Sequence, residues 1–465
     1  MRTMGFVHHA GSRGRRAALV AAVGACGLAL SACGGGTSVG GGGGGGGDEG
    51  GDAAVVDGTG EVGGEIRLAY WGAGARVELT DGVAALFAEA NPGVTVQSEF
   101  ADFAAYWERL NVQASSGNLA CVTQTQGRQL NDYSTKGVLL DLDPMVESGA
   151  IDVSDIPEEV LDTGRGLDGK LYMVPYGAAY DGVTINATLA EQAGVGLPEE
   201  GYGWDDLGTY LTEAQAGLPQ GVAAADLGGG RPNWFIAWVR GQGEELFDGS
   251  EVAFDEQTLV DFWTFWEDLR AAGATNTAEE HAEQPVQSEQ RYVAQGSAML
   301  DSLPGNALTP AQATLDGLAP GQQLTTVPMP SGEAGSGNVL FTSGFSIPVN
   351  CDNVPTAAAF IDFWTNDDEG AALFASNNGG ALNTAHLQAQ LDNPDLPELK
   401  RHELELFQDI VANDPPSVVY PPGYQANFEL GFTRAYDSIA LGGTSVEDAA
   451  AAFIAELSAA LEASA

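Results

Sequence analysis

Strand-like and helix-like segments alternate from residue 65 onward, and this alternation limits the possible folds more than any other feature of the sequence. Five such segments follow one another, three with strand character and two with apolar residues at helical spacing: 66–70, 77–90, 94–100, 103–116 and 119–123. The breaker Asn91-Pro92-Gly93 ends the first helical segment. This order predicts right-handed crossovers and a mainly parallel sheet, and therefore an α/β fold.

About 400 residues follow residue 64, more than one hydrophobic core usually holds, so we expect two lobes. The later part repeats the pattern, with three helices and two strands expected at 207–214, 257–272, 446–463, 297–301 and 341–349. Ligands of such sheets bind beyond the carboxyl ends of the strands. This rule places Trp71 and residues 124–128 at the mouth of a site.

The first 33 residues have the three parts of an export signal. Four arginines and no acid form a basic start, an apolar run covers 17–30, and small residues precede Cys33. This predicts a signal peptide over 1–32 and not a spanning helix. Leu30-Ser31-Ala32-Cys33 resembles a bacterial lipobox, which implies cleavage before Cys33 and a lipid on that cysteine. We therefore expect a lipoprotein on the outer face of the cell membrane. A plain secretory signal is the alternative, and either Sec or twin-arginine export is possible.

Residues 33–64 are rich in glycine, with an unbroken run at 40–47, which is typical of a flexible linker. No later apolar run is long enough to cross a bilayer, so we expect a soluble body held only by the lipid anchor.

Acidic residues dominate the chain after the signal. Four of the 18 basic residues lie in the signal, which leaves 14 basic against 64 acidic residues and a formal charge of −50. Nucleic-acid binding requires a basic surface, so this class of partner is excluded. The acids are dispersed and lysines are few, which is typical of a solvated surface adapted to high salt.

Cys121 and Cys351 are the two cysteines beyond the signal and the lipobox. They have no Cys-x-x-Cys spacing and no neighbouring histidines, so we expect no zinc site, and the sequence predicts no other metal and no cofactor. Outside the cytoplasm disulfides persist. A bond between the two cysteines is one interpretation, and two buried thiols are the other.

Several stretches, taken in order, resemble the extracellular solute-binding proteins of ABC sugar importers, family 1, which includes maltose-binding protein. They are IRLAYWG, LFAEANPGVTV, YWERLNVQASSGN, TQTQGRQLNDYSTKGVLLDLDP, LDGKLYMVPYGAAYDGVTINATLAEQAGV, GWDDLGTYL and SGFSIPVNCDNVPTAAAFIDFWTNDDEG. No single motif is diagnostic, but together the stretches cover most of residues 65–455.

The resemblance implies a periplasmic-binding-protein fold with two α/β lobes joined by a hinge of several segments. The first lobe would comprise 65–175 and 338–365, and the second 181–337 and 369–465. This assignment puts Cys121 in the same lobe as Cys351, which favours a disulfide. The implied function is capture of a sugar or oligosaccharide between the lobes, closure, and delivery to the membrane permease. The chain would act as a monomer and not as an enzyme, and it lacks the loop that binds ATP.

A sugar site needs flat aromatic surfaces for C–H faces and fixed polar groups for hydroxyls. Trp71, Trp234 and Tyr424 are therefore the candidates for stacking on a sugar ring. Trp107, Trp263, Trp266 and Trp364 lie in helical runs and are expected in the core, whereas Trp238 fits either role.

The polar candidates follow strands or lie at the expected hinge. Gln126 and Arg128 stand where the family often has an acid and an arginine, so the acid is missing here. The other candidates lie near the crossover, after a second-lobe strand and near the returning hinge: Tyr176, Tyr180, Asp301, Asn306, Gly344 and Phe345. The family commonly has a tryptophan near Asn306, and this sequence has none.

Two other classes stay open. Within binding proteins, the acidity keeps a cationic solute such as a polyamine possible, and iron is a further candidate. A secreted glycoside hydrolase would need two carboxylates about 5 or 6.5–9.5 Å apart across a sugar cleft. Among 64 acids, none stands in a recognisable catalytic setting.

Overall fold

The computed structural model describes residues 56–285, 287–413 and 418–464. The predicted signal peptide, Cys33 and the linker up to residue 55 lie outside the described residues. Within the described ranges, no helix combines the length and the apolar character needed to span a membrane.

Most strands of the described chain belong to one sheet with the order β2-β1-β3-β10-β4-β8-β5, and β9 and β11 also pair with β4. Their bounds are β1 (Gly64–Trp71), β2 (Val94–Ala101), β3 (Val122–Gln126), β4 (Val174–Asn186), β5 (Ala223–Ala225), β8 (Ala298–Pro304), β9 (Leu324–Val327), β10 (Leu340–Ser346) and β11 (Gly380–Ala381). A separate hairpin joins β6 (Phe247–Asp248) to β7 (Glu251–Val252).

The predicted parallel pairing holds for β1 with β2 and with β3, and also for β5 with β8. The pairs that involve β4 and β10 are antiparallel. The α/β prediction is therefore confirmed, with antiparallel strands where the chain crosses the middle of the sheet.

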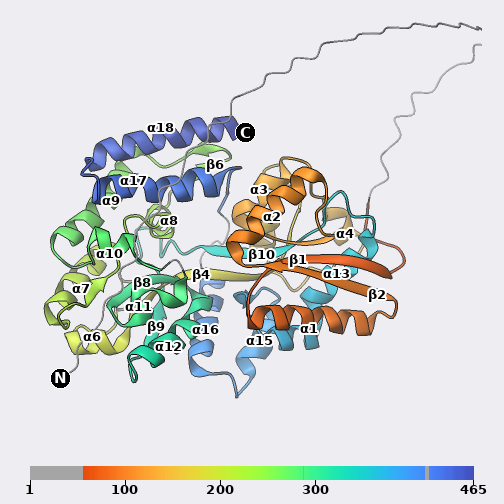
Figure 1. Cartoon of the computed structure of the whole chain (residues 1–465), viewed down its shortest axis with the longest axis horizontal. Helices are drawn as coiled ribbons and strands as arrows, with labels where there is room; N and C mark the ends of the chain where they lie inside the picture. The colour runs from red at the N-terminus through yellow and green to blue at the C-terminus, as the bar shows by residue number, and fades with distance from the viewer. Residues whose placement is uncertain (1–55, 286, 414–417, 465) are drawn as a thin grey trace, which may run out of the picture. The chain divides into compact units, whose positions relative to one another are not determined.

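Strand β4 joins the two halves of the sheet (Figure 1). Its first part pairs with β10, with Val174 opposite Phe345 and Tyr180 opposite Leu340. Its second part pairs with β8, beginning with Asp181 opposite Pro304. A strand of 13 residues spans roughly 40 Å, so one continuous segment reaches from one half to the other.

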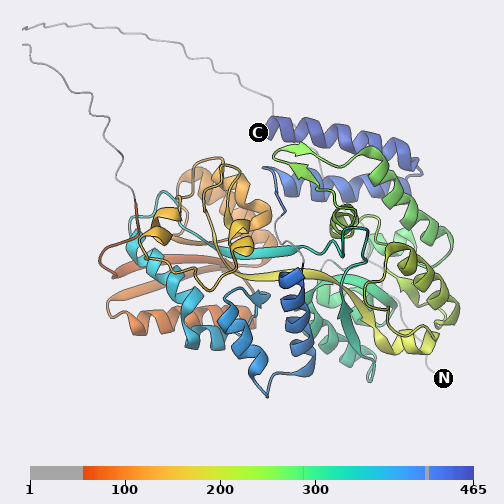
Figure 2. The ribbon, with the colours of Figure 1, turned by 180° about the vertical axis from the view of Figure 1, so that it is seen from behind.

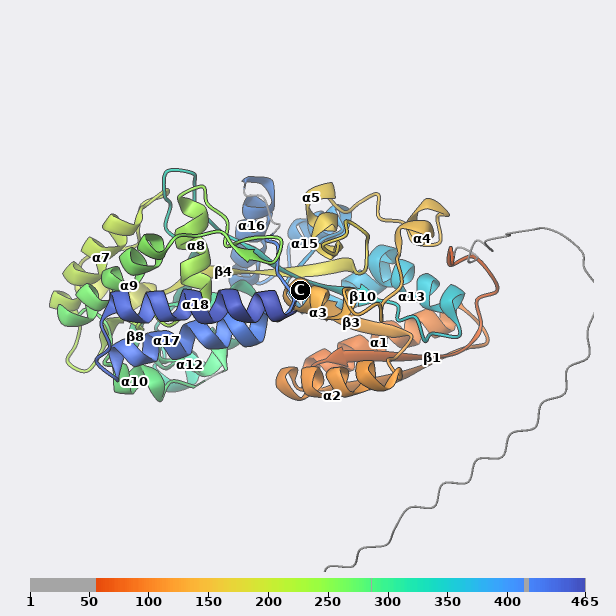
Figure 3. The ribbon, with the colours of Figure 1, turned by 90° about the horizontal axis from the view of Figure 1, so that it is seen from above.

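Helices pack on both halves (Figure 1, Figure 3). The first half carries α1 (Ala75–Ala90), α2 (Phe103–Ser116), α3 (Gly127–Ser134), α4 (Asp143–Glu147), α5 (Glu158–Leu161), α13 (Val354–Asn366), α14 (Asp368–Phe374), α15 (Thr384–Asp392) and α16 (Glu398–Asn413). The second half carries α6 (Ala187–Ala193), α7 (Trp204–Gly217), α8 (Pro232–Gly241), α9 (Glu256–Ala271), α10 (Ala278–Ala282), α11 (Tyr292–Gln295), α12 (Leu308–Leu318), α17 (Leu430–Ala440) and α18 (Val446–Ser464).

Each half has its own large hydrophobic core. Leu68, Phe87 and Phe360 lie in the first, and Trp263 and Phe432 in the second. Separate cores allow the two halves to keep their own structures if they move relative to each other.

Residues 374–410 pack with the first half, whereas the sequence analysis placed 369–465 in the second lobe. Phe374 and Phe407 belong to the first core. The reason is that β11 pairs with β4 at Gly177 and Ala178, which holds α14, α15 and α16 against that half. Seen from behind in Figure 2, α16 lies beside β4, and the Tyr180 hydroxyl donates to the Glu403 carbonyl at 3.2 Å.

A disulfide joins Cys121 to Cys351, with the two Cα atoms 4.8 Å apart. Cys121 directly precedes β3, and Cys351 follows β10. Because β3 and β10 are antiparallel neighbours, the start of one strand lies near the end of the other. The bond therefore links segments 230 residues apart inside the first core.

The start of α9 offers a test of local stability. The Asp255 carboxylate accepts from the Thr258 backbone N–H at 2.8 Å, and these bonds to Thr258 lower the pKa of Asp255. We expect Asp255→Ala to reduce the free energy of unfolding by about 1 kcal/mol. A lowered folded-state pKa means that the stabilisation is present above the ordinary pKa of about 3.9 and is lost as the pH falls through the folded value.

Urea unfolding of wild type and Asp255→Ala at pH 7 and at pH 2.5 measures this difference. A gap of the same size at both pH values would contradict the role of the ionised cap.

Candidate functional site

The carboxyl ends of β1, β2 and β3 lie at one edge of the first half. Trp71 is the last residue of β1 and is opposite Ala101 at the end of β2, and Gln126 ends β3. Helix α3 begins directly after Gln126, so Arg128 is in its first turn. The structure thus brings Trp71, Gln126 and Arg128 to the same edge, as the strand order predicts.

Trp71 does not present an open ring at this edge. It is 5% exposed, and its ring lies 5.6 Å from the rings of Phe103, Tyr106 and Trp107. The expectation that Trp71 stacks directly on a ligand is corrected by this burial, because α2 covers the ring.

The other aromatic candidates are also in the cores. Trp234 is 1% exposed and packs between Trp204 and Trp266. The rings of Tyr424 and Phe345 are buried too, against Phe428 and Tyr176 respectively. Trp234 faces inward because the apolar residues of α8 pack against α9.

Gln124, which lies within the range expected at the mouth, connects several site residues of the first half. Its side-chain oxygen accepts from the Trp71 backbone N–H at 3.0 Å, and its amide donates to the Tyr176 hydroxyl. Asn378 donates to the same hydroxyl at 3.2 Å. Burial raises the pKa of Tyr176 to about 12, so this phenol stays neutral. Tyr176 therefore serves as a fixed part of the hinge strand and is already bonded within the protein.

Arg128 links the two halves. Its Nη1 donates to Glu429 Oε1 at 2.7 Å, and its Nε and Nη2 donate to Gln126 Oε1 at 3.2 and 3.1 Å. The guanidinium carbon lies 4.8 Å from the centre of the Phe341 ring. Burial alone would lower the pKa of Arg128, but Glu429 and neighbouring groups raise it above its ordinary value. The acid that the family places near this arginine is supplied here by Glu429, far along the chain.

Two more hydrogen bonds join α3 to the segment before α17. The Asn131 amide donates to the Tyr420 carbonyl at 2.9 Å, and the Gly423 N–H donates to Asp132 Oδ1 at 2.7 Å. Together with Arg128 and Glu429, these contacts make α3 and residues 420–429 the polar junction between the halves.

Asp181 stands where β4 passes from one half to the other. It is 5% exposed, its Oδ2 accepts from the Asn233 amide, and its Oδ1 is buried without a hydrogen-bond partner among the described residues. Burial raises its pKa, while Asn233 and three arginines, Arg128, Arg291 and Arg231, act in the opposite direction. A buried carboxylate oxygen without a donor is costly, so it is a natural acceptor for a ligand's O–H or N–H.

A cluster of charged residues surrounds Arg231 in the second half. Arg231 pairs with Asp226 and, at 3.2 Å, with Asp301. The His281 Nδ1 lies 3.1 Å from Asp226 Oδ2. Burial opposes ionisation of Asp226, but Arg231 and His281 outweigh it and hold the pKa of Asp226 below its usual range.

Asp301, predicted as a site residue, is thus a buried member of this cluster. Its side chain is 1% exposed, and Arg291 lies 3.6 Å from it. Burial raises the pKa of Asp301. Asp226, Arg231 and His281 were missed by the sequence reasoning. The signal that could have found Asp226 is its position directly after β5.

The remaining candidates have structural roles or lie at the margin. A Cβ on Gly344 would meet the Val174 carbonyl oxygen at 2.3 Å, so this glycine allows β10 to approach β4. Tyr180 is 2% exposed and bonded to α16. Asn306 is partly exposed in the turn after β8.

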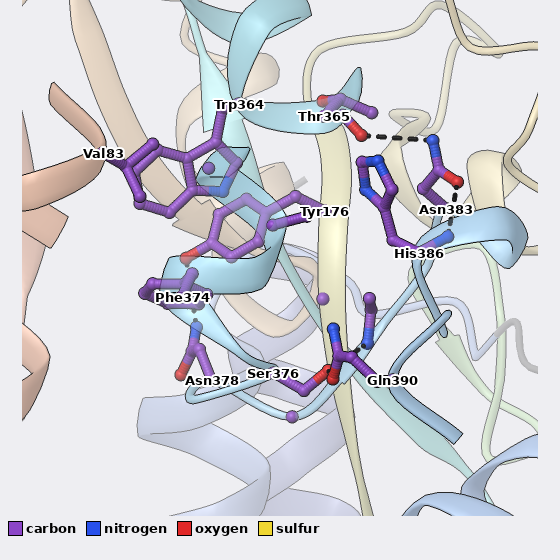
Figure 4. Close-up of a pocket in the computed structure, with 15 residues that line it drawn as sticks. Val83, Tyr176, Trp364, Thr365, Phe374, Ser376, Asn378, Asn383, His386 and Gln390 are labelled. Atoms are coloured by element: carbon purple, nitrogen blue, oxygen red, sulfur yellow. Dashed lines mark hydrogen bonds between the residues drawn. The ribbon is translucent and has the colours of Figure 1, made fainter. Parts of the chain in front are cut away.

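A small cavity lies within the first half, between β4 and helices α13, α14 and α15 (Figure 4). Its volume is about 30 Å³, which is room for roughly two water molecules. Tyr176, Trp364 and Phe374 line one part of it, and Asn383 and His386 line another. This size fits internal hydration and not a sugar.

Within the described residues, no group of three or more His, Cys, Asp or Glu side chains is arranged to hold a metal ion. The polar groups that converge on Asp181 and Arg128 offer hydrogen-bond donors and acceptors for a polar solute.

The fold and this site define a two-lobed α/β binding protein. The sequence profile of the family described as bacterial extracellular solute-binding protein matches residues 82–397. The chain belongs to this family.

Solved structures of similar fold support the same class. A periplasmic solute-binding protein from Pectobacterium atrosepticum has a TM-score of 0.75 and 20% identity, and the match covers 86% of this chain and 99% of that one. The GacH receptor of Streptomyces glaucescens, studied with acarbose, has a TM-score of 0.69, 20% identity and the same coverage. A periplasmic oligogalacturonide-binding protein from Yersinia enterocolitica has a TM-score of 0.68 and 18% identity, again covering 86% and 99%.

Proposed function

We propose that this chain is the substrate-binding component of an ABC importer, which captures a sugar or oligosaccharide between its two halves and delivers it to a membrane permease. The observation that carries the proposal is the buried Asp181 carboxylate, which has an oxygen without a partner at the point where β4 crosses between the halves. A sugar hydroxyl would donate to this oxygen. The polar junction of Arg128 and Glu429 would change as the halves close around the solute.

The two lobes of this proposal follow the two cores. The first comprises residues 65–180 and 338–413, and the second comprises 181–337 and 418–464. The crossing strands β4 and β10 would contain the hinge. The chain would be a monomer held at the outer face of the membrane by a lipid on Cys33, with the glycine-rich segment as its tether.

A cationic solute such as a polyamine is the second candidate. Four carboxylates gather at this site, on Asp181, Asp226, Asp301 and Glu429, against three guanidinium groups. The formal charge of −50 after the signal also favours cations over anions.

A thermal-shift screen tests the proposal. We expect a neutral di- or trisaccharide at a hundred times its dissociation constant to add about 2.7 kcal/mol to the free energy of unfolding, because it binds only the folded state. Spermidine and ferric iron complete the screen. Stabilisation by spermidine or iron alone would reject the sugar assignment, and no shift with any solute would reject the binding function.

Asp181→Asn tests the site within the same screen. The substitution keeps the shape but replaces the orphan acceptor's charge, so we expect at least tenfold weaker sugar binding in calorimetry. Asp268→Asn, at an exposed position of α9, is the matched control and should bind as wild type does.

A further inference from the structure

Phe100 and Phe103 are the two most exposed aromatic side chains in the described part of the chain. Phe100 is 49% exposed near the end of β2, and Phe103 is 38% exposed at the start of α2. The other described aromatic rings, including the tryptophans, are buried or more covered than these two. Two open phenylalanines within four residues of each other are unusual on a surface this acidic, and such a patch commonly marks a binding site.

The two rings are held in place from beneath. The Phe100 ring stacks on Tyr70, with centres 5.9 Å apart and planes 28° apart. Phe103 meets the buried Trp71 ring edge to face at 5.6 Å, and it lies 5.9 Å from Trp107. Each phenylalanine therefore has one covered and one open side.

The backbone between the rings is also fixed. The Asp102 carboxylate accepts from the Ala105 N–H at 3.1 Å and caps α2, and Arg109 Nη1 donates to the Phe100 carbonyl at 3.3 Å. A rigid aromatic surface loses little entropy when a ligand covers it.

The rings lie at the edge that carries the candidate site. Ala101, between them, is opposite Trp71 at the carboxyl end of β1, and the Trp71 backbone is bonded to Gln124 of β3. The same edge continues through Gln126 into Arg128. A solute bound near Arg128 can therefore extend along this edge toward Phe100 and Phe103.

We propose that Phe100 and Phe103 form a stacking platform for a sugar ring of the captured solute, in place of the buried Trp71. This inference rests on the proposed sugar-binding function and adds to it that the solute has at least one ring with an apolar C–H face. Two phenylalanines cover far less than the roughly 800 Å² per partner of a stable protein interface. The patch therefore suits a single ring of a small ligand.

The test compares the wild-type chain with Phe100→Ala, Phe103→Ala and the double variant, by calorimetry with maltotriose, cellobiose, xylobiose and digalacturonate. We expect about tenfold weaker binding for each ring removed from the sugar that the wild type binds. Phe100→Tyr and Phe103→Tyr keep a flat face and should retain most of the affinity. Val112→Ala, at a 68% exposed position of α2, is the matched control.

The outcomes separate this inference from the function on which it rests. If the wild type binds a sugar and the double variant binds it equally well, the platform is wrong while the sugar-binding function stands. If the wild type binds none of the sugars, both fail. If the double variant loses its thermal transition, Phe100→Leu with Phe103→Leu, which keeps apolar bulk without a flat ring, decides in its place. A wild-type dimer in size-exclusion chromatography that the double variant abolishes would also overturn the platform, because it would assign the rings to a second copy.

Discussion

Removal of the disulfide between Cys121 and Cys351 is expected to lower the free energy of unfolding by about 3–5 kcal/mol at 25 °C. The bond joins residues 230 positions apart, so it restricts a very large loop of the unfolded chain. In the folded state both cysteines already lie in or against the first core, between antiparallel strands that stay paired without the bond. The main expected effect is therefore a gain in entropy of the unfolded state.

Guanidinium unfolding of the wild type and of Cys121→Ala with Cys351→Ala measures this effect. Treatment of the wild type with a phosphine reductant is the control, because it breaks the bond without changing the packing of the alanines. Equal midpoints for oxidised and reduced protein would show that the bond contributes nothing. A larger denaturant dependence in the reduced protein would support the entropic explanation, since the unfolded chain would then expose more surface.

Arg231→Ala is expected to cost about 3–5 kcal/mol of folding stability, since it removes one partner from a buried charge cluster. Asp226 and Asp301 are 2% and 1% exposed, and Arg231 pairs with both. Without the guanidinium these carboxylates would stay buried with Arg291 and His281 as their remaining cationic neighbours.

The cost should depend on pH. In the wild type the pKa of Asp226 is lowered, so its contribution is present above about pH 4 and is lost as the pH falls through the folded value. Removing Arg231 raises the folded pKa of the carboxylates, and the variant then becomes more stable as the pH falls and they take up protons. The difference between wild type and variant should therefore shrink in acid.

Arg434→Ala is the matched control for this prediction. Arg434 pairs with Glu456 at 2.8 Å, but the two side chains are 62% and 70% exposed. Exposed pairs contribute little, so we expect a change within about 0.5 kcal/mol. Chemical unfolding at pH 7 and pH 4 compares the two substitutions. Similar small effects for both would contradict the view that Arg231 balances buried charge.

The local pattern was enough to predict the class of fold. The alternation between 66 and 123 corresponds to β1, α1, β2, α2 and β3, because hydrophobic spacing within one element reports which face of it is buried. Strand order also brought Trp71, Gln126 and Arg128 to one edge, since parallel strands end together. The membership in a solute-binding family agrees with the resemblance that these ordered segments carry.

The pattern could not decide which aromatic rings remain open. Trp71 and Phe103 both lie near the end of a strand or the start of a helix, but α2 covers Trp71 and leaves Phe103 exposed. Exposure depends on neighbours that arrive from elsewhere in the chain. The same holds for Trp234, which becomes buried only when α9 packs against α8.

What the sequence by itself determined is therefore the alternation of elements, the α/β class and the edge at which a solute can bind. The tertiary structure decided the composition of that edge. It brought Glu429 to Arg128 across 301 positions, placed Asp226, Arg231 and Asp301 in one buried cluster, and left one oxygen of Asp181 without a donor. The physical reason is that hydrogen bonds and charge pairs act over a few ångströms in space, whereas sequence spacing reports only neighbours within one helix or strand.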